Sequence, residues 1–219
     1  LAIIGGGPIG IEMAQAHVRL GCRVTVVEAA TIMGRDDTEL VKILKSRLTD
    51  EGITFIERIG VKEVAGDKGE ILATLADGQM LKVSHLLVAV GRRPSTDGLD
   101  LAAAGISATP AGITTDKRLR TSTRNIFAIG DVTNRINLTP VAIAEGHAFA
   151  DSEFGGNRRV ADHKNVASAV FSQPPVASVG MTETEAQAAC ATVTVFTSGF
   201  RAMKNTISGR AEKTFVKLI

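Results

Sequence analysis

The sequence is poor in cysteine, nearly balanced in charge and free of long hydrophobic runs. Its two cysteines, Cys22 and Cys190, cannot form a disulfide framework and do not stand at the spacing of a zinc or redox motif, which favours a reducing compartment. Against 23 acidic residues, 25 Lys and Arg residues give a formal net charge of +2, so neither nucleic acid nor an acidic membrane is expected as the main partner. No apolar run approaches the roughly 20 residues needed to cross a bilayer. We therefore expect a cytoplasmic protein that binds neither nucleic acid nor membrane, and no metal site.

The composition and the two ends of the sequence indicate what kind of chain it is. With 44% hydrophobic and 22% charged residues over 219 positions, it has the composition of a globular protein with a core of its own. It opens without a Met in a strand-like apolar run, and it stops within the apolar alternation of residues 214–219. We therefore expect an internal piece of a longer protein.

A glycine-rich motif follows the first predicted strand. The apolar run Leu1–Ile4 predicts a short buried strand, the next residues match GxGxxG through Gly5, Gly7 and Gly10, and a helix is predicted over residues 11–20. In a dinucleotide site, Gly5 permits the tight turn, Gly7 lets backbone amides approach the pyrophosphate, and Gly10 allows the helix to pack closely. The alternative is a purely structural turn. The order of strand, glycines, helix and second strand favours the nucleotide site.

The second strand ends in an acidic residue that bears on the choice of nucleotide. Residues 24–27 predict this strand, and Glu28 follows it, eighteen residues after Gly10. A carboxylate here accepts hydrogen bonds from the adenosine ribose and repels a 2′-phosphate, so that NADH is favoured over NADPH. The alternative for Glu28 is a solvated acid at a strand end. Arg35, a few residues on, is either a second phosphate contact or a surface arginine at a helix start.

The helix after the glycines has a predicted buried face and one acidic residue near its start. We expect Met13, Ala16 and Leu20 to lie on the buried face. Glu12 is open to two interpretations, because the helix dipole favours an anion near the N-terminus and the nicotinamide end of a cofactor would also lie nearby. Spacing alone does not separate a capping role from a cofactor contact.

The rest of the first region continues the α/β pattern and then changes to short strands. Asp36 and Glu39 form a start resembling a capping box for a second helix, which ends at Gly52. Turn residues separate the short strands that follow the second helix. The three strands expected over residues 61–65, 70–76 and 80–83 predict an antiparallel meander. A final apolar strand ends at Gly91, near which we expect a domain boundary. The strands after the second helix are expected over residues 53–56, 61–65, 70–76, 80–83 and 86–90.

A second candidate site follows a long linking region. A short buried strand is predicted over residues 126–129, and it stops at Gly130 and Asp131. The dipeptide Thr139-Pro140 predicts the N-cap and first position of another helix. A carboxylate at Asp131 can accept hydrogen bonds from the hydroxyls of a polyol, while amides at the helix start face an electron-rich ring. The alternative is a turn-forming Asp satisfied by its own backbone.

Several ordered motifs resemble those of one known family, the flavin-dependent pyridine nucleotide-disulfide oxidoreductases. This family includes glutathione reductase, lipoamide dehydrogenase and mercuric reductase, and the likeness covers the whole chain. The resemblance implies FAD and NAD(P)H as cofactors. The motifs that carry it are residues 5–12, 88–94, 128–132, 138–142 and 166–180.

Carried over residue by residue, the resemblance implies two sets of cofactor contacts. Asp131, after Gly130 in the second flavin motif, would hold the ribityl hydroxyls of FAD. The backbone of Leu138, Thr139 and Pro140 would lie near the isoalloxazine ring. The residues implied along the nucleotide, besides the motif glycines, are Pro8 within the motif, Ile9 and Glu12 at the nicotinamide, and Gly91.

The resemblance also implies an α/β fold in three parts. Residues 1–91 would form a Rossmann-like NAD(P)H-binding domain, residues 92–158 the second segment of an FAD-binding domain, and residues 159–219 the start of an α+β dimerisation domain. A homodimer of the full-length protein is implied in the same way.

The expected function is that of a flavoprotein disulfide reductase. Hydride would pass from NAD(P)H to FAD, and electrons would then pass to a small-molecule disulfide, with glutathione disulfide as the leading substrate. The stretch Phe200–Arg210 resembles glutathione reductase, whereas Val26–Ala30 is closer to lipoamide dehydrogenase or mercuric reductase. An enzyme of either of those two kinds is one alternative. A non-catalytic dinucleotide-binding module is another.

No catalytic residue is expected within the chain itself. The family's redox-active cysteine pair would precede Leu1, and its His-Glu acid/base pair would follow Ile219. His147 and His163 lie in polar helical or loop stretches, where histidines are more often ordinary surface residues than bases.

Overall fold

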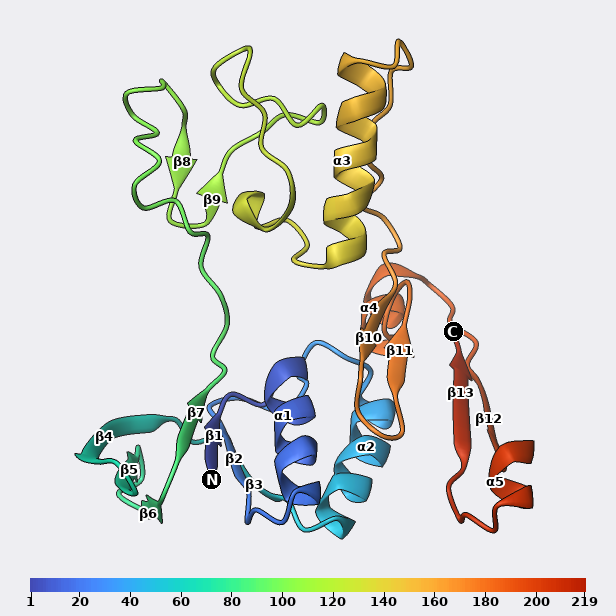
Figure 1. Cartoon of the computed structure of the whole chain (residues 1–219). Helices are drawn as coiled ribbons and strands as arrows, with labels where there is room; N and C mark the ends of the chain where they lie inside the picture. The colour runs from blue at the N-terminus through green and yellow to red at the C-terminus, as the bar shows by residue number, and fades with distance from the viewer. The chain divides into compact units, whose positions relative to one another are not determined.

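The computed structural model describes residues 1–219 and divides the chain into two compact units. The first unit combines Leu1–Val90 with Ala169–Ile219, and the second is Gly91–Ser168. Figure 1 shows the elements of each unit along the chain. The predicted mixed α/β fold with a parallel sheet is confirmed, and the sheet lies in the first unit.

The sheet of the first unit has four parallel strands in the order β3-β2-β1-β7. Registered partners on neighbouring strands point to the same face, and Val26 pairs with both Ile3 and Phe55. Ile3 also pairs with Leu87. One face of the sheet is therefore a continuous apolar row. The strands are β1 (Ala2–Ile4), β2 (Thr25–Glu28), β3 (Thr54–Glu57) and β7 (Leu86–Val88).

Two helices, α1 (Pro8–Arg19) and α2 (Thr38–Asp50), cover this apolar row. Figure 1 shows them side by side next to the sheet. Both contribute fully buried side chains to the core that contains the apolar row, and each large one stabilises the fold by about 1.5–3 kcal/mol. The main contributors from the helices are Ile11 and Ala14 on α1 and Leu44 and Leu48 on α2.

The predicted buried face of α1 is wrong at Ala16 and Leu20, whereas Met13 is half-buried and packs against the core as expected. The helix begins at Pro8, earlier than expected, because proline suits the first turn of a helix. The side chains that it buries are those of Ile11, Ala14 and Gln15, whereas Ala16 is exposed. Leu20 lies beyond the last helical residue and is 80% exposed.

The start of α2 also differs from the prediction by one residue. The N-cap is Asp37, whose carboxylate accepts a hydrogen bond from the N–H of Glu39 at 3.1 Å. Asp36 therefore lies before the cap. A side-chain oxygen at the N-cap satisfies one of the free amides of the first turn, and Asp37 does this at a spacing of two residues.

The predicted meander is confirmed as a three-stranded antiparallel sheet. Its strands are β4 (Val61–Asp67), β5 (Glu70–Leu75) and β6 (Met80–Val83), in the order β4-β5-β6. Ala73 and Leu75 are its buried side chains, both on the central strand.

The C-terminal segment of the first unit forms two short β-ribbons and two short helices. Thr182 and Glu185 exchange hydrogen bonds in a capping box at the start of α4. The ribbons are antiparallel β12 with β13 and the pair β10 with β11. The elements are β10 (Ser168–Val170), β11 (Val176–Ser178), α4 (Glu183–Ala189), β12 (Phe196–Phe200), α5 (Met203–Ile207) and β13 (Thr214–Leu218).

Two side chains of helix α1, those of Glu12 and Gln15, form hydrogen bonds with backbone groups of this segment, as a neighbouring strand would. Gln15, only 4% exposed, donates to the carbonyl of Gln173 at 2.8 Å and accepts from its N–H at 2.7 Å. Glu12 accepts from the N–H of Phe171 at 2.9 Å. Backbone groups that follow β10 thus find their partners on a helix.

A buried lysine makes the second connection between the two parts of the first unit. Lys217 on β13 lies 3.0 Å from both carboxylate oxygens of Asp37 and 2.6 Å from Glu183, and its side chain is 5% exposed. The hydrogen bond to Glu183 raises the pKa of Lys217, and those to Asp37 and Glu39 raise it further against the opposing effect of burial. The ammonium group therefore stays charged.

The second unit has little regular structure apart from one long helix. It contains the two-residue strands β8 (Ala108–Thr109) and β9 (Gly112–Ile113), the 3₁₀ helix η1 (Gly130–Thr133) and α3 (Thr139–Glu153). The linking character predicted for its first part is confirmed. None of the helices in either unit is both long enough and apolar enough to cross a membrane.

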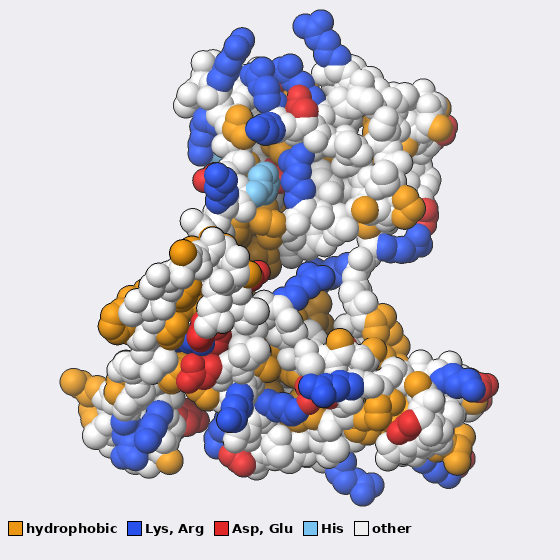
Figure 2. Space-filling model, turned by 180° about the vertical axis from the view of Figure 1, so that it is seen from behind, with side chains coloured by type: hydrophobic (Ala, Val, Ile, Leu, Met, Phe, Trp, Pro, Cys, Tyr) orange, Lys and Arg blue, Asp and Glu red, His pale blue; other side chains and the backbone are white.

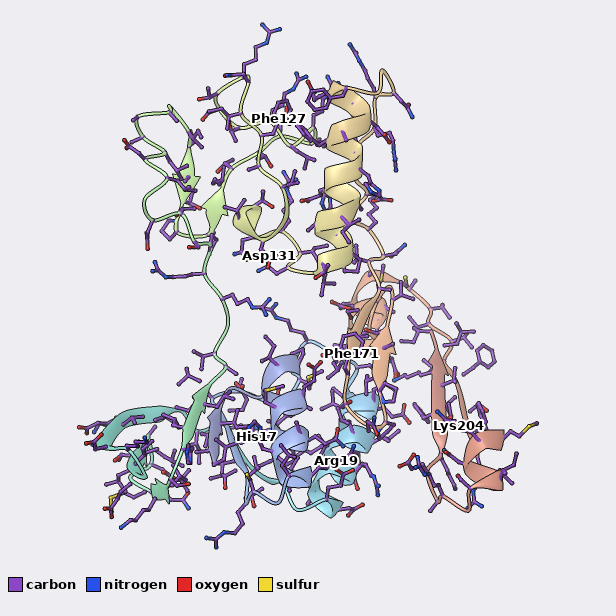
Figure 3. All side chains as sticks on the ribbon, viewed as in Figure 1. His17, Arg19, Phe127, Asp131, Phe171 and Lys204 are labelled. Atoms are coloured by element: carbon purple, nitrogen blue, oxygen red, sulfur yellow. The ribbon has the colours of Figure 1, made fainter.

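The strand predicted over residues 126–129 is wrong. Only a single bridge between Arg120 and Phe127 forms there. A strand needs a neighbour to satisfy its backbone groups, and no other strand of the second unit runs beside these residues. Phe127 instead packs its ring against Phe149 of α3, with the ring centroids 4.8 Å apart. Figure 3 shows Phe127 beside the far end of that helix.

Replacing Lys217 by alanine should destabilise the first unit by about 3 kcal/mol, because it leaves the buried carboxylate of Asp37 without its cation. Lys82→Ala is the matched control, since Lys82 pairs with Glu70 on the exposed meander and surface pairs contribute little. Calorimetric unfolding of both variants and the wild type checks this prediction. Equal small losses in the two variants would contradict it.

Acid should weaken the same connection. Burial alone would raise the pKa of Asp37, but hydrogen bonds from Lys217 and from the N–H groups of Glu183 and Glu39 outweigh it and lower the pKa. The carboxylate therefore adds stability above the ordinary Asp pKa of about 3.9, and this is lost as the pH falls through the lower folded value.

Between pH 5 and pH 3, the thermal unfolding midpoint should thus fall further for the wild type than for Asp37→Asn. Asp50→Asn, at an exposed carboxylate in the last turn of α2, is the control and should follow the wild-type curve. A wild-type curve that runs parallel to that of Asp37→Asn would show that Asp37 is not the titrating group.

Candidate functional site

The glycine loop between β1 and α1 is shaped by two close backbone contacts. Gly5 has φ +107°, and a Cβ there would overlap the carbonyl of Ala89. A Cβ on Gly10 would overlap the carbonyl oxygen of Gly5. These are the tight turn and the close helix packing that the sequence predicts for the two glycines.

The amides at the start of α1 face open space. A Cβ on Gly7 would meet nothing within 4 Å. The N–H groups of Gly7, Ile9 and Gly10 donate no hydrogen bond within the chain, and Pro8 has no N–H. Unpaired donors at the positive end of a helix dipole form a natural anion site. The residues present therefore fit a pyrophosphate at this point, with Ile9 half-exposed beside it.

Glu28 is anchored to the glycine loop and is not a freely solvated acid. One carboxylate oxygen accepts from the N–H of Gly6 at 2.7 Å, and the other accepts from the N–H of Ala30 at 2.9 Å. Each oxygen has a second lone pair, so the group can still accept hydrogen bonds from ribose hydroxyls. Gly6, a variable position of the motif to which the sequence assigns no role, thus fixes this acid. A Cβ there would collide with Ile32.

The structure excludes the capping interpretation of Glu12. Its position is beyond the first turn of α1, and its carboxylate accepts from the N–H of Phe171, so it does not cap the helix. Figure 3 shows Phe171 at the ribbon that follows the second unit along the chain. Arg35, in the loop before α2, is exposed and makes no hydrogen bond or ion pair.

Asp131 lies in the second unit, in η1 and close to the start of α3 (Figure 3). Its carboxylate accepts no hydrogen bond within the chain, and its nearest cation is the guanidinium of Arg92 at 3.9 Å. The alternative of a turn-forming Asp satisfied by its own backbone is therefore wrong. The carboxylate opens on a hollow of about 280 Å³ lined by Arg92, Arg93, Pro94, Ser95, Asp131, Val132 and Asn137.

The start of α3 differs from the prediction by one residue. Leu138 is the N-cap, and Thr139 and Pro140 occupy the first two helical positions. The amides of Val141 and Ala142 already donate to the carbonyl of Leu138, which leaves the N–H of Thr139 as the unpaired donor of this turn. Fewer free amides face outward here than the sequence suggests.

Gly91 is the first residue of the second unit and directly follows Val90. Its φ of +110° is a conformation that favours glycine. A Cβ there would meet nothing within 4 Å, so the position has room for a ligand atom.

One buried acid of the second unit was not predicted from the sequence. Glu145 on α3 is 1% exposed and accepts a hydrogen bond from the N–H of Gly130 at 2.6 Å. His163, which the sequence suggests is an ordinary surface residue, lies 2.7 Å from the same carboxylate, so that expectation is wrong. His147 is exposed, as expected. The recurrence of buried Val141, Glu145 and Ala148 at helical spacing is the signal that could have revealed this acid.

The predicted site residues thus fall into two groups in different units. Gly5 to Glu12 and Glu28 come together at the carboxyl edge of the parallel sheet, and Arg35 follows without a contact to them. Gly130, Asp131 and the residues from Leu138 onward come together at the start of α3. Gly91 begins the second unit.

Comparison with known proteins places the chain among flavin-linked reductases. Residues 1–146 match the family "Pyridine nucleotide-disulphide oxidoreductase", and residues 166–219 match its dimerisation domain. The whole chain is 42% identical over 222 residues to a glutathione reductase of Burkholderia cepacia, covering 49% of that protein. It is 36% identical over 223 residues to a mercuric reductase of Streptomyces lividans, covering 47% of that protein.

Solved structures give the same picture. The HOCl-induced flavoprotein disulfide reductase RclA of Escherichia coli, as the copper(II) complex of a mutant form, matches 99% of this chain and 49% of its own with a TM-score of 0.91 and 31% identity. The chain spans about half the length of the curated relatives that it matches. With the family match over residues 1–146, these likenesses show that the chain belongs to the pyridine nucleotide-disulphide oxidoreductase family.

Proposed function

We propose that the chain is the nucleotide-binding and flavin-contacting part of a disulfide reductase that passes hydride from NAD(P)H to FAD and electrons on to glutathione disulfide. The observation that carries the proposal is the open amide array of Gly7, Ile9 and Gly10 beside the anchored carboxylate of Glu28. Family membership supports the flavin part. FAD supplies the acceptor for the hydride and the donor of electrons to the disulfide.

On the nucleotide side, the first unit binds and orients. The amides of the glycine loop hold the pyrophosphate, and the remaining lone pairs of Glu28 accept from the adenosine ribose. Ile9 and Glu12 lie along the nicotinamide. Because Glu12 also accepts from the N–H of Phe171, its side chain is held in place before the nucleotide arrives.

On the flavin side, Asp131 accepts hydrogen bonds from the ribityl hydroxyls, for which its carboxylate has no competing donor within 3.5 Å in the chain. Thr139 offers its unpaired N–H toward the ring, and Leu138 and Pro140 flank it. Gly91 supplies a backbone conformation that leaves room for the cofactor, and Gly130 supplies the positive φ of the turn before Asp131.

We assign three functional parts, residues 1–91 for NAD(P)H, 92–158 for FAD and 159–219 for a homodimer interface, in a cytoplasmic protein. The match of residues 166–219 to a dimerisation domain supports the last part. Exposed apolar side chains on its final ribbon and helix, visible in Figure 2, offer a surface for a second copy. They are Phe196, Phe200, Met203, Ile207, Val216 and Leu218.

A mercuric reductase-like or lipoamide-reducing activity is the second candidate. The observation that favours it is the 36% identity to the Streptomyces lividans enzyme over the whole chain.

Steady-state rates of the full-length protein with glutathione disulfide, lipoamide and mercuric ion should be highest with glutathione disulfide. The purified protein should also carry the visible absorbance of a bound flavin. A protein that binds NADH without flavin would instead be a non-catalytic nucleotide-binding module.

The preference for NADH over NADPH should depend on the charge of Glu28. Glu28→Gln keeps an acceptor for one backbone N–H but removes the negative charge that a 2′-phosphate would meet, so the ratio of the NADPH to the NADH Kd should fall about tenfold. Glu28→Arg with Ala29→Arg should carry the shift further toward NADPH. Nucleotide titrations of the full-length protein measure both ratios.

Glu63→Gln, at an exposed acid of the meander, is the matched control and should leave the ratio unchanged. If Glu28→Gln has the wild-type ratio, Glu28 does not discriminate between the nucleotides. Arg35→Ala then tests the other candidate, because an arginine that binds the 2′-phosphate would lose NADPH affinity specifically.

A further inference from the structure

Glu145 is a buried carboxylate that the proposed hydride and electron path does not use. It lies on α3 with 1% of its surface exposed. A buried charge is strongly unfavourable unless it is paired and hydrogen-bonded. Glu145 meets this requirement through three groups that come from three different segments of the second unit.

The shortest of these contacts holds the turn that carries Asp131. One oxygen of Glu145 accepts from the N–H of Gly130 at 2.6 Å, and the hydroxyl of Thr133 donates to the carbonyl of Gly130 at 2.9 Å. Gly130 has φ +69°, and a Cβ there would lie 3.1 Å from the Cβ of Ala142. The glycine is thus pinned by both of its backbone polar groups and packed against α3. This arrangement therefore fixes the direction in which the chain enters Asp131, the next residue.

The other oxygen of Glu145 contacts residues from the segments before and after α3. His163 lies 2.7 Å away, and since a carboxylate only accepts, the histidine carries a proton on Nε2. Arg135, whose Nη1 lies 3.9 Å from Glu145, also donates to the carbonyls of Thr115 and Asp116. Glu145 is therefore the shared centre of the Gly130 turn, the loop before α3 and the coil after it.

We infer that Glu145 is a positioning residue for flavin binding, which acts by holding Gly130 so that the carboxylate of Asp131 points to the ribityl hydroxyls. This inference rests on the proposed function and names a residue that supports it from within the fold. Glu145 itself is buried beneath the turn, so its role would be to hold Gly130 and not to contact the cofactor. Its contribution is to fix the turn before FAD binds, which lowers the ordering cost of binding.

The test is a titration of FAD into the full-length apoprotein, in which binding is monitored by flavin fluorescence and visible circular dichroism. Glu145→Ala removes the acceptor of the Gly130 N–H and should raise the FAD Kd by at least tenfold. Glu145→Gln retains a carbonyl acceptor for that N–H and should stay within about threefold of wild type. Glu153→Gln, two turns further along α3, removes an ion pair with Arg120 and is the matched control for a general weakening of the helix.

A double-mutant cycle separates positioning from a merely structural role. If Glu145 acts through Asp131, then Glu145→Ala should raise the Kd at least tenfold in the wild-type background but less than threefold when Asp131 is already Asn. A structural role would give the same factor in both backgrounds. Additive effects, or a Glu145→Ala protein with wild-type affinity, would overturn the inference.

Glu145→Asp provides a second variant if the alanine protein does not fold. It keeps the charge but withdraws the oxygens by one methylene, so the Kd should again rise about tenfold, and a wild-type Kd would overturn the inference. Failure of the proposed function is distinguishable from these results. In that case the wild-type protein itself would bind no FAD, whatever residue stands at position 145.

Discussion

The contact between Gly10 and the carbonyl of Gly5 is the constraint on which the nucleotide site depends. It exists only because Gly10 projects no side chain into the narrow gap between α1 and the end of β1. With the helix held there, its first amides emerge at the carboxyl edge of the sheet, unpaired and in open space. A side chain on Gly10 would push the helix away and separate those amides from Glu28, which is tied to the neighbouring Gly6.

The two units solve one physical problem in the same way. In each, a glycine turn ends an apolar run, and a carboxylate from a neighbouring element accepts the N–H of a glycine in that turn. Glu28 does so for Gly6, and Glu145 does so for Gly130. An ionised acceptor makes a stronger hydrogen bond to an amide than a neutral one. A turn that is not held by the hydrogen bonds of a long β-sheet gains rigidity from such a carboxylate.

Local patterns explain why part of this could be predicted from the sequence. The glycine spacing and the acid at the end of β2 follow from rules about neighbours along the chain, and so does the alternation that revealed the meander. The buried face of α1 could not be read in this way, because Gln15 is buried by its pairing with Gln173, a partner 158 residues away. Residues 126–129 have a strand-like composition, but a strand also needs a partner that the sequence pattern does not name.

Glu145 illustrates the same limit at the candidate flavin site. Its helical spacing with Val141 and Ala148 places it on the buried face, yet a glutamate there contradicts the rule that such faces are apolar. The contradiction is resolved only by the donors Gly130 and His163 and the nearby cation Arg135, which the fold brings together from outside the helix. A polar residue that breaks a local pattern and is then fully paired marks a place where the fold constrains a turn, and here that turn carries Asp131.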